Sequence, residues 1–215
     1  MKSLKVIEKV SAKLAPGQNP YFNRVHVFKA LEILSAGAVG RVRLARELML
    51  GEGTTRTLVK HLKNEGLIEI SKSGIILSKL GKKVLSNLKS KISEGIEIPK
   101  SPLTVGPSNI AILIRNAANL VKNGVEQRDA AIKAGALGAT TLIFKQGKLT
   151  IPGLSEDILQ NQNIQSICNT IISKLKPKEN DIIIIGSANK KQTAEIAAKT
   201  AALEILKQQN PMKHP

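Results

Sequence analysis

One stretch of the sequence decides the fold, residues 51–74, and it reads Gly51-Glu52-Gly53-Thr54-Thr55-Arg56-Thr57-Leu58-Val59-Lys60-His61-Leu62-Lys63-Asn64-Glu65-Gly66-Leu67-Ile68-Glu69-Ile70-Ser71-Lys72-Ser73-Gly74. After a turn at two glycines, Leu58, Val59 and Leu62 recur at the spacing of one helical face, which predicts a helix that buries this side. Thr55 lies one turn earlier on the same side. Thr54 is the expected N-cap, because its hydroxyl can accept a hydrogen bond from a free backbone amide.

The opposite side of this predicted helix is basic. Arg56, Lys60 and Lys63 stand at i, i+4 and i+7, so their side chains stack along one face. Thr57 and His61 lie beside them. A row of basic side chains on one helix face indicates a polyanionic partner.

A hairpin follows this helix at once. Gly66 ends the helix, residues 67–70 alternate like a strand, and residues 75–77 return as the second strand. Lys72 and Ser73 lie in the turn between them. A basic helix followed by a basic-tipped hairpin is the layout of a winged helix-turn-helix, which predicts that the helix enters a major groove and that the hairpin tip touches the adjacent groove or phosphate.

Helices are also predicted on both sides of this stretch. Residues 1–15 have an amphipathic pattern that ends at the prolines of residues 16–20. Residues 27–34 form the first helix of the DNA-binding unit. After the hairpin, residues 78–92 form a further helix, with a buried face of Val84, Leu85, Leu88 and Ile92.

Residues 40–50 form the second helix of the motif, with an inward side of Val42, Ala45 and Leu48 or Met49. Arg41, Arg43 and Arg46 decorate the outside. In a helix-turn-helix this element crosses the phosphate backbone, so the arginines are candidates for contacts that set register without reading bases. The alternative is an ordinary solvated face.

Residues 26–92 resemble the winged-helix domain of prokaryotic transcription regulators. Residues 53–68 are similar to the recognition helix and first wing strand of the large bacterial families, and Leu77-Ser78-Lys79-Leu80-Gly81 matches the Leu-Thr-x-x-Gly that opens their next helix. With the second half included, the chain resembles an archaeal family of winged-helix transcription regulators whose C-terminal domain has no assigned chemistry. The resemblance implies double-stranded DNA as the partner. The residues expected to contact it are Arg41, Arg43, Arg46, Thr54, Thr55, Arg56, Thr57, Lys60, His61, Lys63, Lys72 and Ser73.

Charge is distributed in agreement with this interpretation. The net charge is +17, and residues 1–100 contain 19 of the 33 basic but 8 of the 16 acidic residues. That half therefore has a net charge of +11 and residues 101–215 have +6, so the excess accompanies the basic helix and hairpin. Cys168 is the single cysteine, which suits a reducing cytoplasm, and we expect a cytoplasmic protein.

The chain is expected to form an α+β protein, an N-terminal winged helix-turn-helix domain plus a C-terminal mixed α/β sandwich domain. The expected boundaries are residues 1–93 for the first domain, 94–102 for a linker, 103–208 for the second domain and 209–215 for a tail. In the second domain we predict a mixed sheet from strands at 109–114, 140–144, 148–151 and 181–186. Helices are predicted at 116–123, at 125–137 with Gly138 as its stop, at 155–175 with a cap at Ser155, and at 189–207 with a cap at Asn189.

Polar residues gather at several places in the second domain. Strand ends in open sheets and the beginnings of helices bind anions, which makes a small anionic effector a hypothesis for this domain. The candidates are Arg115, Gln127, Arg128, Asp129, Thr140, Thr141, Ser187, Asn189 and Lys190. Structural ion pairs between Arg128 or Arg115 and Asp129, and tight helix-to-strand packing near Thr140, are the alternatives.

No catalytic residues, cofactor or metal site are assigned. The three histidines, His26, His61 and His214, have no metal-ligand spacing. We therefore expect a non-enzymatic transcription regulator that binds double-stranded DNA as a homodimer, with the second domain sensing a small molecule or mediating dimerisation. The alternative is an enzyme or metabolite-binding protein that uses the winged helix as an interaction module.

Overall fold

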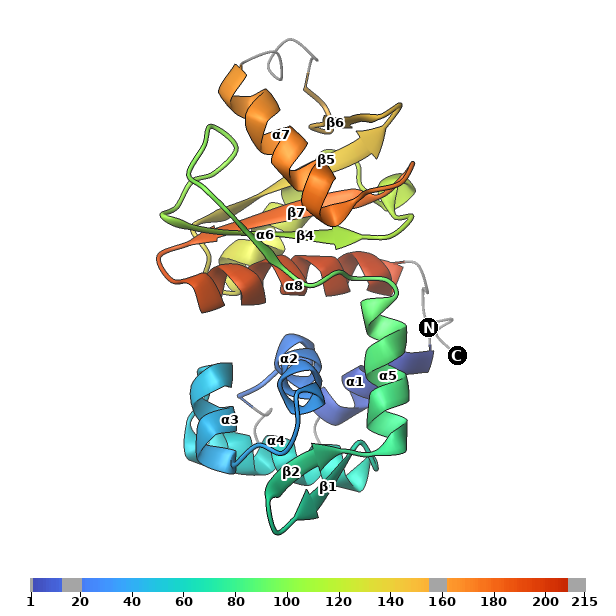
Figure 1. Cartoon of the computed structure of the whole chain (residues 1–215), viewed down its shortest axis with the longest axis vertical. Coiled ribbons are helices and arrows are strands. Elements are labelled where there is room, and N and C mark those ends of the chain that lie inside the picture. The colour runs from blue at the N-terminus through green and yellow to red at the C-terminus, as the bar shows by residue number, and fades with distance from the viewer. Residues whose placement is uncertain (1, 13–20, 155–161, 209–215) are drawn as a thin grey trace. The chain divides into compact units, whose positions relative to one another are not determined.

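The computed structural model describes residues 2–12, 21–154 and 162–208. The chain divides into two compact units, Met1–Lys89 and Ser90–Pro215, which are coloured along the chain in Figure 1. Each unit is described by itself. The residues predicted as a stop at 16–20 and as a cap at Ser155 lie outside the described residues, as does the tail.

The first unit contains the predicted helices and hairpin in the predicted order. Its elements are α1 (Lys2–Ser11), α2 (Arg24–Ser35), α3 (Arg41–Leu48), α4 (Glu52–Asn64), β1 (Ile68–Ser71), β2 (Gly74–Leu77) and α5 (Lys79–Lys89).

The first helix belongs to the core of this unit. Leu4, Ile7 and Val10 are buried, and α1 packs on α2, α4 and α5. An ion pair of 2.9 Å between Arg24 and Glu8 ties α1 to the beginning of α2. The N-terminal extension is therefore a structural part of the helix-turn-helix unit.

Two glycines hold the hairpin in place. Val39 and Ile75 exchange backbone hydrogen bonds of 3.0 and 2.9 Å, which attach β2 to the segment before α3. Gly74 has φ +132°, and a Cβ there would lie 3.0 Å from the Val39 carbonyl. Gly81 lies still closer to the Leu67 backbone, since a Cβ would meet the Leu67 oxygen at 2.0 Å. Side chains at these two positions would push the hairpin away from the helices.

Three local predictions for the first unit are wrong. The N-cap of α4 is Gly51 instead of Thr54, because the extended backbone at Gly51 precedes a helix that already begins at Glu52. Val42 is 67% exposed, because the buried stripe of α3 runs along Leu44, Ala45 and Leu48, and Val42 points the other way. Ile92 lies beyond α5 and forms a β-bridge with Ile114.

The second unit is built on one five-stranded sheet. The strands are β3 (Ile96–Ile98), β4 (Ser108–Ile114), β5 (Gly138–Lys145), β6 (Lys148–Thr150) and β7 (Ile182–Ala188), and their order is β3-β4-β7-β5-β6. Each of these pairs is antiparallel, so the expectation of a mixed sheet is wrong for the strands described. β7 lies at the centre, paired with β4 along seven residues.

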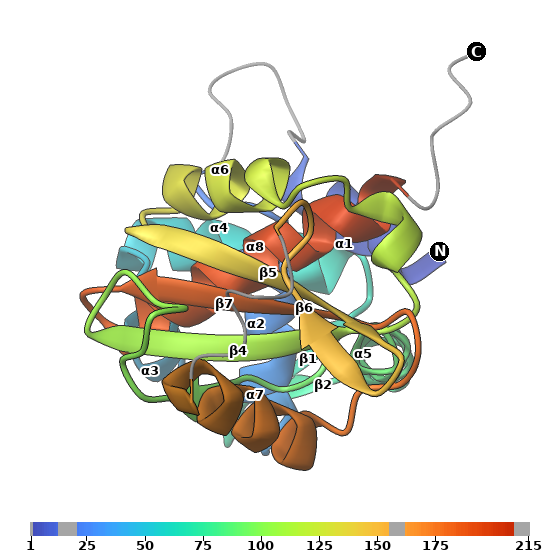
Figure 2. The same ribbon diagram turned by 90° about the horizontal axis from the view of Figure 1, so that it is seen from above.

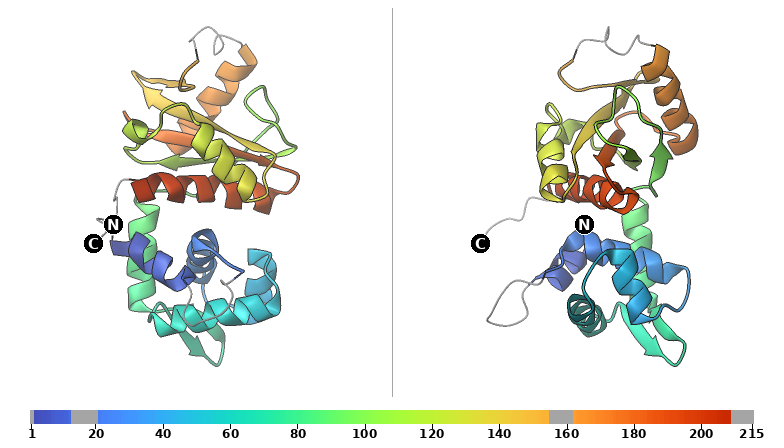
Figure 3. Two further views of the ribbon diagram at one scale, coloured as in Figure 1. Left: turned by 180° about the vertical axis from the view of Figure 1, so that it is seen from behind. Right: turned by 90° about the vertical axis from the view of Figure 1, so that its left-hand side faces the viewer.

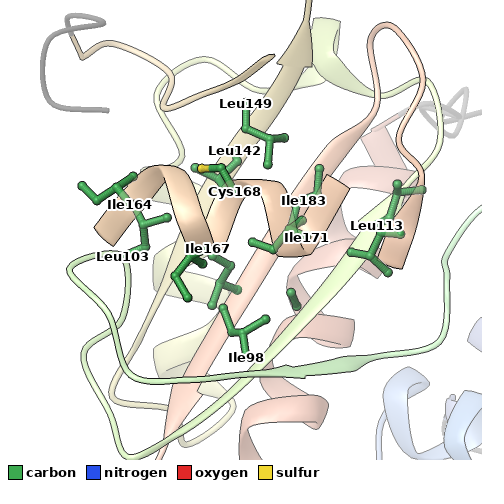
Figure 4. Packing of buried hydrophobic residues seen from close by; sticks show 13 residues of the cluster. Ile98, Leu103, Leu113, Leu142, Leu149, Ile164, Ile167, Cys168, Ile171 and Ile183 are labelled. Atoms are coloured by element: carbon green, nitrogen blue, oxygen red, sulfur yellow. The ribbon is translucent and has the colours of Figure 1, made fainter. Parts of the chain in front are cut away.

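Helices cover both faces of the sheet. α6 (Val125–Lys133) and α8 (Lys191–Gln208) lie on one face and α7 (Gln162–Leu175) lies on the other, as Figures 2 and 3 show. The α+β architecture predicted from the sequence is therefore confirmed. Under α7, aliphatic side chains from all five strands form a cluster that also buries Cys168 (Figure 4). Burial raises the pKa of the Cys168 thiol, as expected for a small apolar side chain in a core.

The α8 helix approaches the sheet closely. A Cβ on Gly186 would lie 2.4 Å from the Ala194 carbonyl oxygen, and Ala194, Ala197 and Ala198 are fully buried. Small side chains on both elements allow this distance.

Four predictions for the second unit need correction. Residues 94–102 are more than a linker, because Ile96–Ile98 pair with β4 as an edge strand. α6 ends at Lys133, and Gly138 begins β5, because Gly135 with φ +92° already turns the chain. Residues 116–123 contain only a short 3₁₀ turn, Ala118–Leu120. The last helix begins at Lys191, two residues after Asn189.

No helix in the described ranges has the length and apolar character to cross a bilayer.

The beginning of α2 contains a histidine that should make stability depend on pH. The Nδ1 atom of His26 accepts a hydrogen bond of 3.2 Å from the Asn23 amide, while the Asn23 side chain accepts one from Val25. Burial, and secondly the charge of Lys29, lower the pKa of His26 from its ordinary 6.5. The folded chain therefore favours neutral His26 more than the unfolded chain does.

Because the folded pKa is the lower one, the stabilisation is present above pH 6.5 and is lost as the pH falls from 6.5 through the folded pKa. We expect His26→Gln to reduce this loss, since glutamine keeps the acceptor at this helix position without titrating. Urea unfolding at several pH values measures it. If the wild type and His26→Gln lose the same unfolding free energy as the pH falls, the role of His26 is contradicted.

Candidate nucleic-acid interface

The α4 helix presents basic side chains on one face only. Arg56, Thr57, Lys60 and Lys63 are exposed, whereas Leu58, Val59 and Leu62 are buried beneath them. In the part of the chain that the structure describes, none of the three basic side chains has an acidic partner. Their charge is therefore available to a ligand.

Two residues predicted to touch DNA lie instead in the interior. Thr55 is fully buried and its hydroxyl donates to the Gly51 carbonyl at 3.1 Å. His61 is also buried, and its Nδ1 lies 2.7 Å from the Val10 carbonyl oxygen. Since a carbonyl oxygen can only accept, Nδ1 carries the proton. The Phe22 ring and the imidazole form a T-shaped pair with centroids 5.4 Å apart.

The packing of α4 on α1 explains why His61 lies in the interior instead of on the DNA-facing side. His61 follows Leu58 by three positions, so it shares the buried side of α4 and meets α1 there. Its bond to Val10 joins the back of α4 to α1, and an ion pair of 2.9 Å between Lys9 and Glu65 adds a second link. Thr55 and His61 therefore position α4 from behind. Thr54 is half-buried at the beginning of the helix.

The arginines of α3 point outward as predicted. Arg41, Arg43 and Arg46 are all exposed. Arg43 donates to Glu47 at 2.6 Å, a pair at i, i+4 that the sequence spacing could have revealed. For Arg41 and Arg46 the described residues offer no acidic partner. Three residues, Met49 to Gly51, separate α3 from α4, and Met49 with φ 55° makes the turn.

The tip of the hairpin is a compact basic turn. Lys72 and Ser73 are exposed between β1 and β2. The Ser71 hydroxyl donates to the Gly74 carbonyl at 2.9 Å and lies 2.8 Å from the Ser73 hydroxyl, which closes the turn. Lys72 is thereby carried on a turn that is closed by hydrogen bonds. α4 and the hairpin lie next to each other in the first unit (Figure 1).

The candidate ligand residues of the second unit do not form one site. Arg115 follows β4 and pairs with the buried Asp181 at 2.6 Å. The other Asp181 oxygen accepts from the Asn116 amide at 2.8 Å, and the Lys178 amide adds a further bond of 2.8 Å. Arg115 therefore stabilises the strand ends, with Asp181 as its partner instead of Asp129. Arg128 and Asp129 do form a pair, at 3.2 Å, and both are about half exposed.

Two other candidates lie at the opposite end of the same strands and bond within the chain. The buried Ser187 donates to Asn109 at 2.7 Å, and the Thr140 hydroxyl donates to the Leu103 carbonyl at 2.7 Å. Sequence reasoning missed Asn109 and Asp181, because each bonds to a residue more than 60 positions away. Asn189 and Lys190 are exposed beyond β7.

Gln127 and Thr141 are candidates that lie in the interior of the second unit. Both are buried, Gln127 in the first turns of α6 and Thr141 on the β5 face that α6 covers. The Thr141 hydroxyl is the one buried side-chain polar atom of the described residues without a hydrogen-bond partner. A Cβ on Gly124, the N-cap of α6, would lie 3.3 Å from this hydroxyl.

Two comparisons concern the separate halves of the chain. Residues 22–92 match the family model of the CggR N-terminal DNA binding domain. Residues 105–205 match a domain of unknown function, DUF4443. The first unit is thus a helical DNA-binding domain, joined to an α+β domain, and the match supports a DNA-binding regulator.

A solved structure resembles nearly the whole chain. Hypothetical protein PH0730 from Pyrococcus horikoshii OT3 is similar over 87% of this chain and 94% of its own, with a TM-score of 0.69 and 27% sequence identity. None of the curated proteins matches this chain. The shared architecture therefore extends over both units.

Neighbouring threonines of β5 should respond to valine substitution with opposite signs. Thr141→Val removes a buried hydroxyl without a partner, so we expect an increase in unfolding free energy of about 1 kcal/mol. Thr140→Val is the matched control, because it deletes the bond to Leu103 and should cost about 1 kcal/mol. Chemical denaturation of both variants measures the difference. Destabilisation by Thr141→Val would indicate that its hydroxyl has a partner in solution, such as a ligand or an ordered water.

Proposed function

We propose that this chain regulates transcription by binding duplex DNA through the first unit, with α4 in the major groove. The observation that carries the proposal is the row of Arg56, Lys60 and Lys63, exposed and unpaired among the described residues, on a helix whose other side is buried. A helix presented in this way is the element that enters the major groove in helix-turn-helix proteins. The family match of the same residues supports this function.

Side chains near the beginning of α4 are proposed to read bases. Arg56 can donate two hydrogen bonds to the O6 and N7 atoms of guanine, and Lys60 follows one turn later. Thr57 and the half-buried Thr54 complete this set with hydroxyls that reach base edges or flanking phosphates. Lys63 lies further along, where a phosphate contact fits better.

Phosphate contacts are proposed for α3 and for the hairpin. Arg41, Arg43 and Arg46 would hold the backbone on one side of α4, and Lys72 with Ser73 would do so from the hairpin tip. Such contacts fix orientation without reading sequence. They also make binding depend strongly on salt.

For the second unit we propose dimerisation as the main role, and this makes the protein a homodimer on DNA. Most of the candidate ligand residues already bond within the chain, notably Arg115, Thr140 and Ser187. A small effector is the second candidate function. The unpartnered Thr141 hydroxyl beside the beginning of α6 favours it.

Substitutions in the two DNA-contacting elements should have different effects. Arg56→Ala should cost about 1–3 kcal/mol on the specific sequence and relax specificity, because it removes a base contact. Lys72→Ala should weaken binding to all sequences about equally, because it removes a phosphate contact. Fluorescence anisotropy with specific and random duplexes measures both. Equal losses on both duplexes for Arg56→Ala would remove the base-reading assignment.

The salt dependence of binding tests the interface as a whole. With about six phosphate contacts per chain, and therefore about twelve in the homodimer, log K should fall linearly with log salt with a slope of about −11. Arg46→Ala should lower the magnitude of the slope by about 2, since its guanidinium is proposed to contact one phosphate in each of the two chains. Titrations at several salt concentrations provide the slope. A full-length protein that is indifferent to DNA, with turnover in the second unit, would favour the alternative of an enzyme.

A further inference from the structure

The exposed large aliphatic side chains of the second unit gather around one helix, α6. Val125 and Ile132 lie on it, and Leu137 follows its end. The other two are Val105 and Leu154. The Cγ2 atom of Val105 lies 2.9 Å from the position that a Cβ on Gly138 would take. Leu154 follows Gly153, where a Cβ would lie 3.9 Å from the Cβ of Asn123, just before α6. Their exposed fractions are 63% for Val105, 52% for Leu154, 49% for Leu137, 47% for Ile132 and 39% for Val125.

The outward side of α6 has a simple order. Gln127 and Ala131 face the sheet, and the outward stripe consists of Val125 and Glu126, then the adjacent Arg128 and Asp129, then Ile132 and Lys133. The stripe thus has an exposed aliphatic side chain beside a charged one at each end, and one positive and one negative charge in the middle. Figure 3 shows this helix beside α8, on the same face of the sheet.

This helix is electrically neutral in a basic chain. α6 contains two acidic and two basic residues, whereas the chain has a net charge of +17. Two such chains repel one another over most of their surfaces. A neutral patch with exposed aliphatic side chains is a place where a second copy can approach without that repulsion.

The stripe is complementary to itself. If two α6 helices pack antiparallel about a two-fold axis between residues 128 and 129, Val125 of one copy faces Ile132 of the other. The same axis places Arg128 opposite Asp129 of the second copy. A two-fold interface requires such reciprocity, because residue i contacts j and j contacts i.

We propose that α6, with Val105, Leu137 and Leu154 around it, forms a two-fold interface between two copies of this chain. The nine residues of α6 extend over only about 13.5 Å. The three flanking side chains are therefore needed to approach the roughly 800 Å² per partner of a standard interface. The inference deepens the proposed function, since it rests on the homodimer and assigns the surface that forms it.

The other outward helix of the second unit is less suited to this role. The outer side of α7 forms an open hollow of about 580 Å³ lined by Gln162, Gln165, Ser166, Asn169, Thr170 and Ser173. It is uncharged but has no exposed large aliphatic side chain among the described residues. Amides and hydroxyls lose water on association without the apolar gain that α6 offers.

The test is sedimentation equilibrium of the full-length chain. The wild type should be a dimer, and Ile132→Glu should raise the dimer dissociation constant at least about tenfold, because a carboxylate would be buried opposite Val125. Gln165→Glu on α7 adds the same charge at an exposed site and is the matched control, with no change expected. Circular dichroism and thermal unfolding verify that each variant is folded.

A charge exchange tests the register. Arg128→Asp alone places carboxylates opposite one another across the axis and should weaken the dimer. Asp129→Arg alone does the same with guanidinium groups. The double variant R128D/D129R restores opposite charges across the axis and should recover most of the wild-type affinity. Both side chains are about half exposed, so these variants should fold even if Ile132→Glu does not.

Several results would overturn the inference. They are a monomeric wild type, a dimer that is unchanged in folded Ile132→Glu or in Arg128→Asp, and a dimer that Gln165→Glu disrupts. DNA titrations in parallel separate this inference from the proposed function. If a monomeric wild type binds DNA, the α6 interface is contradicted but the DNA-binding function is not. If the chain forms an α6-dependent dimer that does not bind DNA, the proposed regulator function is contradicted but the interface is not.

Discussion

The first unit depends on one constraint, namely that α4 is anchored from one side only. Its buried stripe packs on the helical core, and the His61 bond to the Val10 carbonyl fixes the back of the helix to α1. A histidine in this position satisfies a backbone acceptor and fills space beside Phe22. The basic side chains on the other side of α4 can therefore remain in solvent. The segment before α3 holds the hairpin in place through the Val39–Ile75 bridge.

Elements with a long and regular pattern could be predicted from the sequence. The 3.6-residue period of α4, the short hairpin with glycine at Gly74 and the aliphatic run of β7 each carry their signal locally. The same is true of the α+β class and of the outward basic residues on α3 and α4. These features depend on residues that are close in the sequence, so a single amino-acid sequence is enough to predict them.

Several misplaced residues depend on contacts far away in the chain. His61 is polar, and only the position of α1 shows that it faces the core. Arg115 finds Asp181 from the next strand of the sheet, a partner that no spacing indicates. Residues 96–98 lie near two prolines and resemble a linker, yet β4 offers them an open edge with which to pair. Composition does not distinguish such a short strand from a loop.

The same short strand has a consequence for how this chain avoids unwanted assembly. The five-stranded sheet ends on both sides in strands of three residues, β3 and β6. A free edge is a template for adding strands from other chains, and the number of hydrogen bonds that it offers grows with its length. Edges this short offer an incoming strand few backbone hydrogen bonds. Protection against amyloid-like growth is thus built into the outermost strands, independently of what the helices bind.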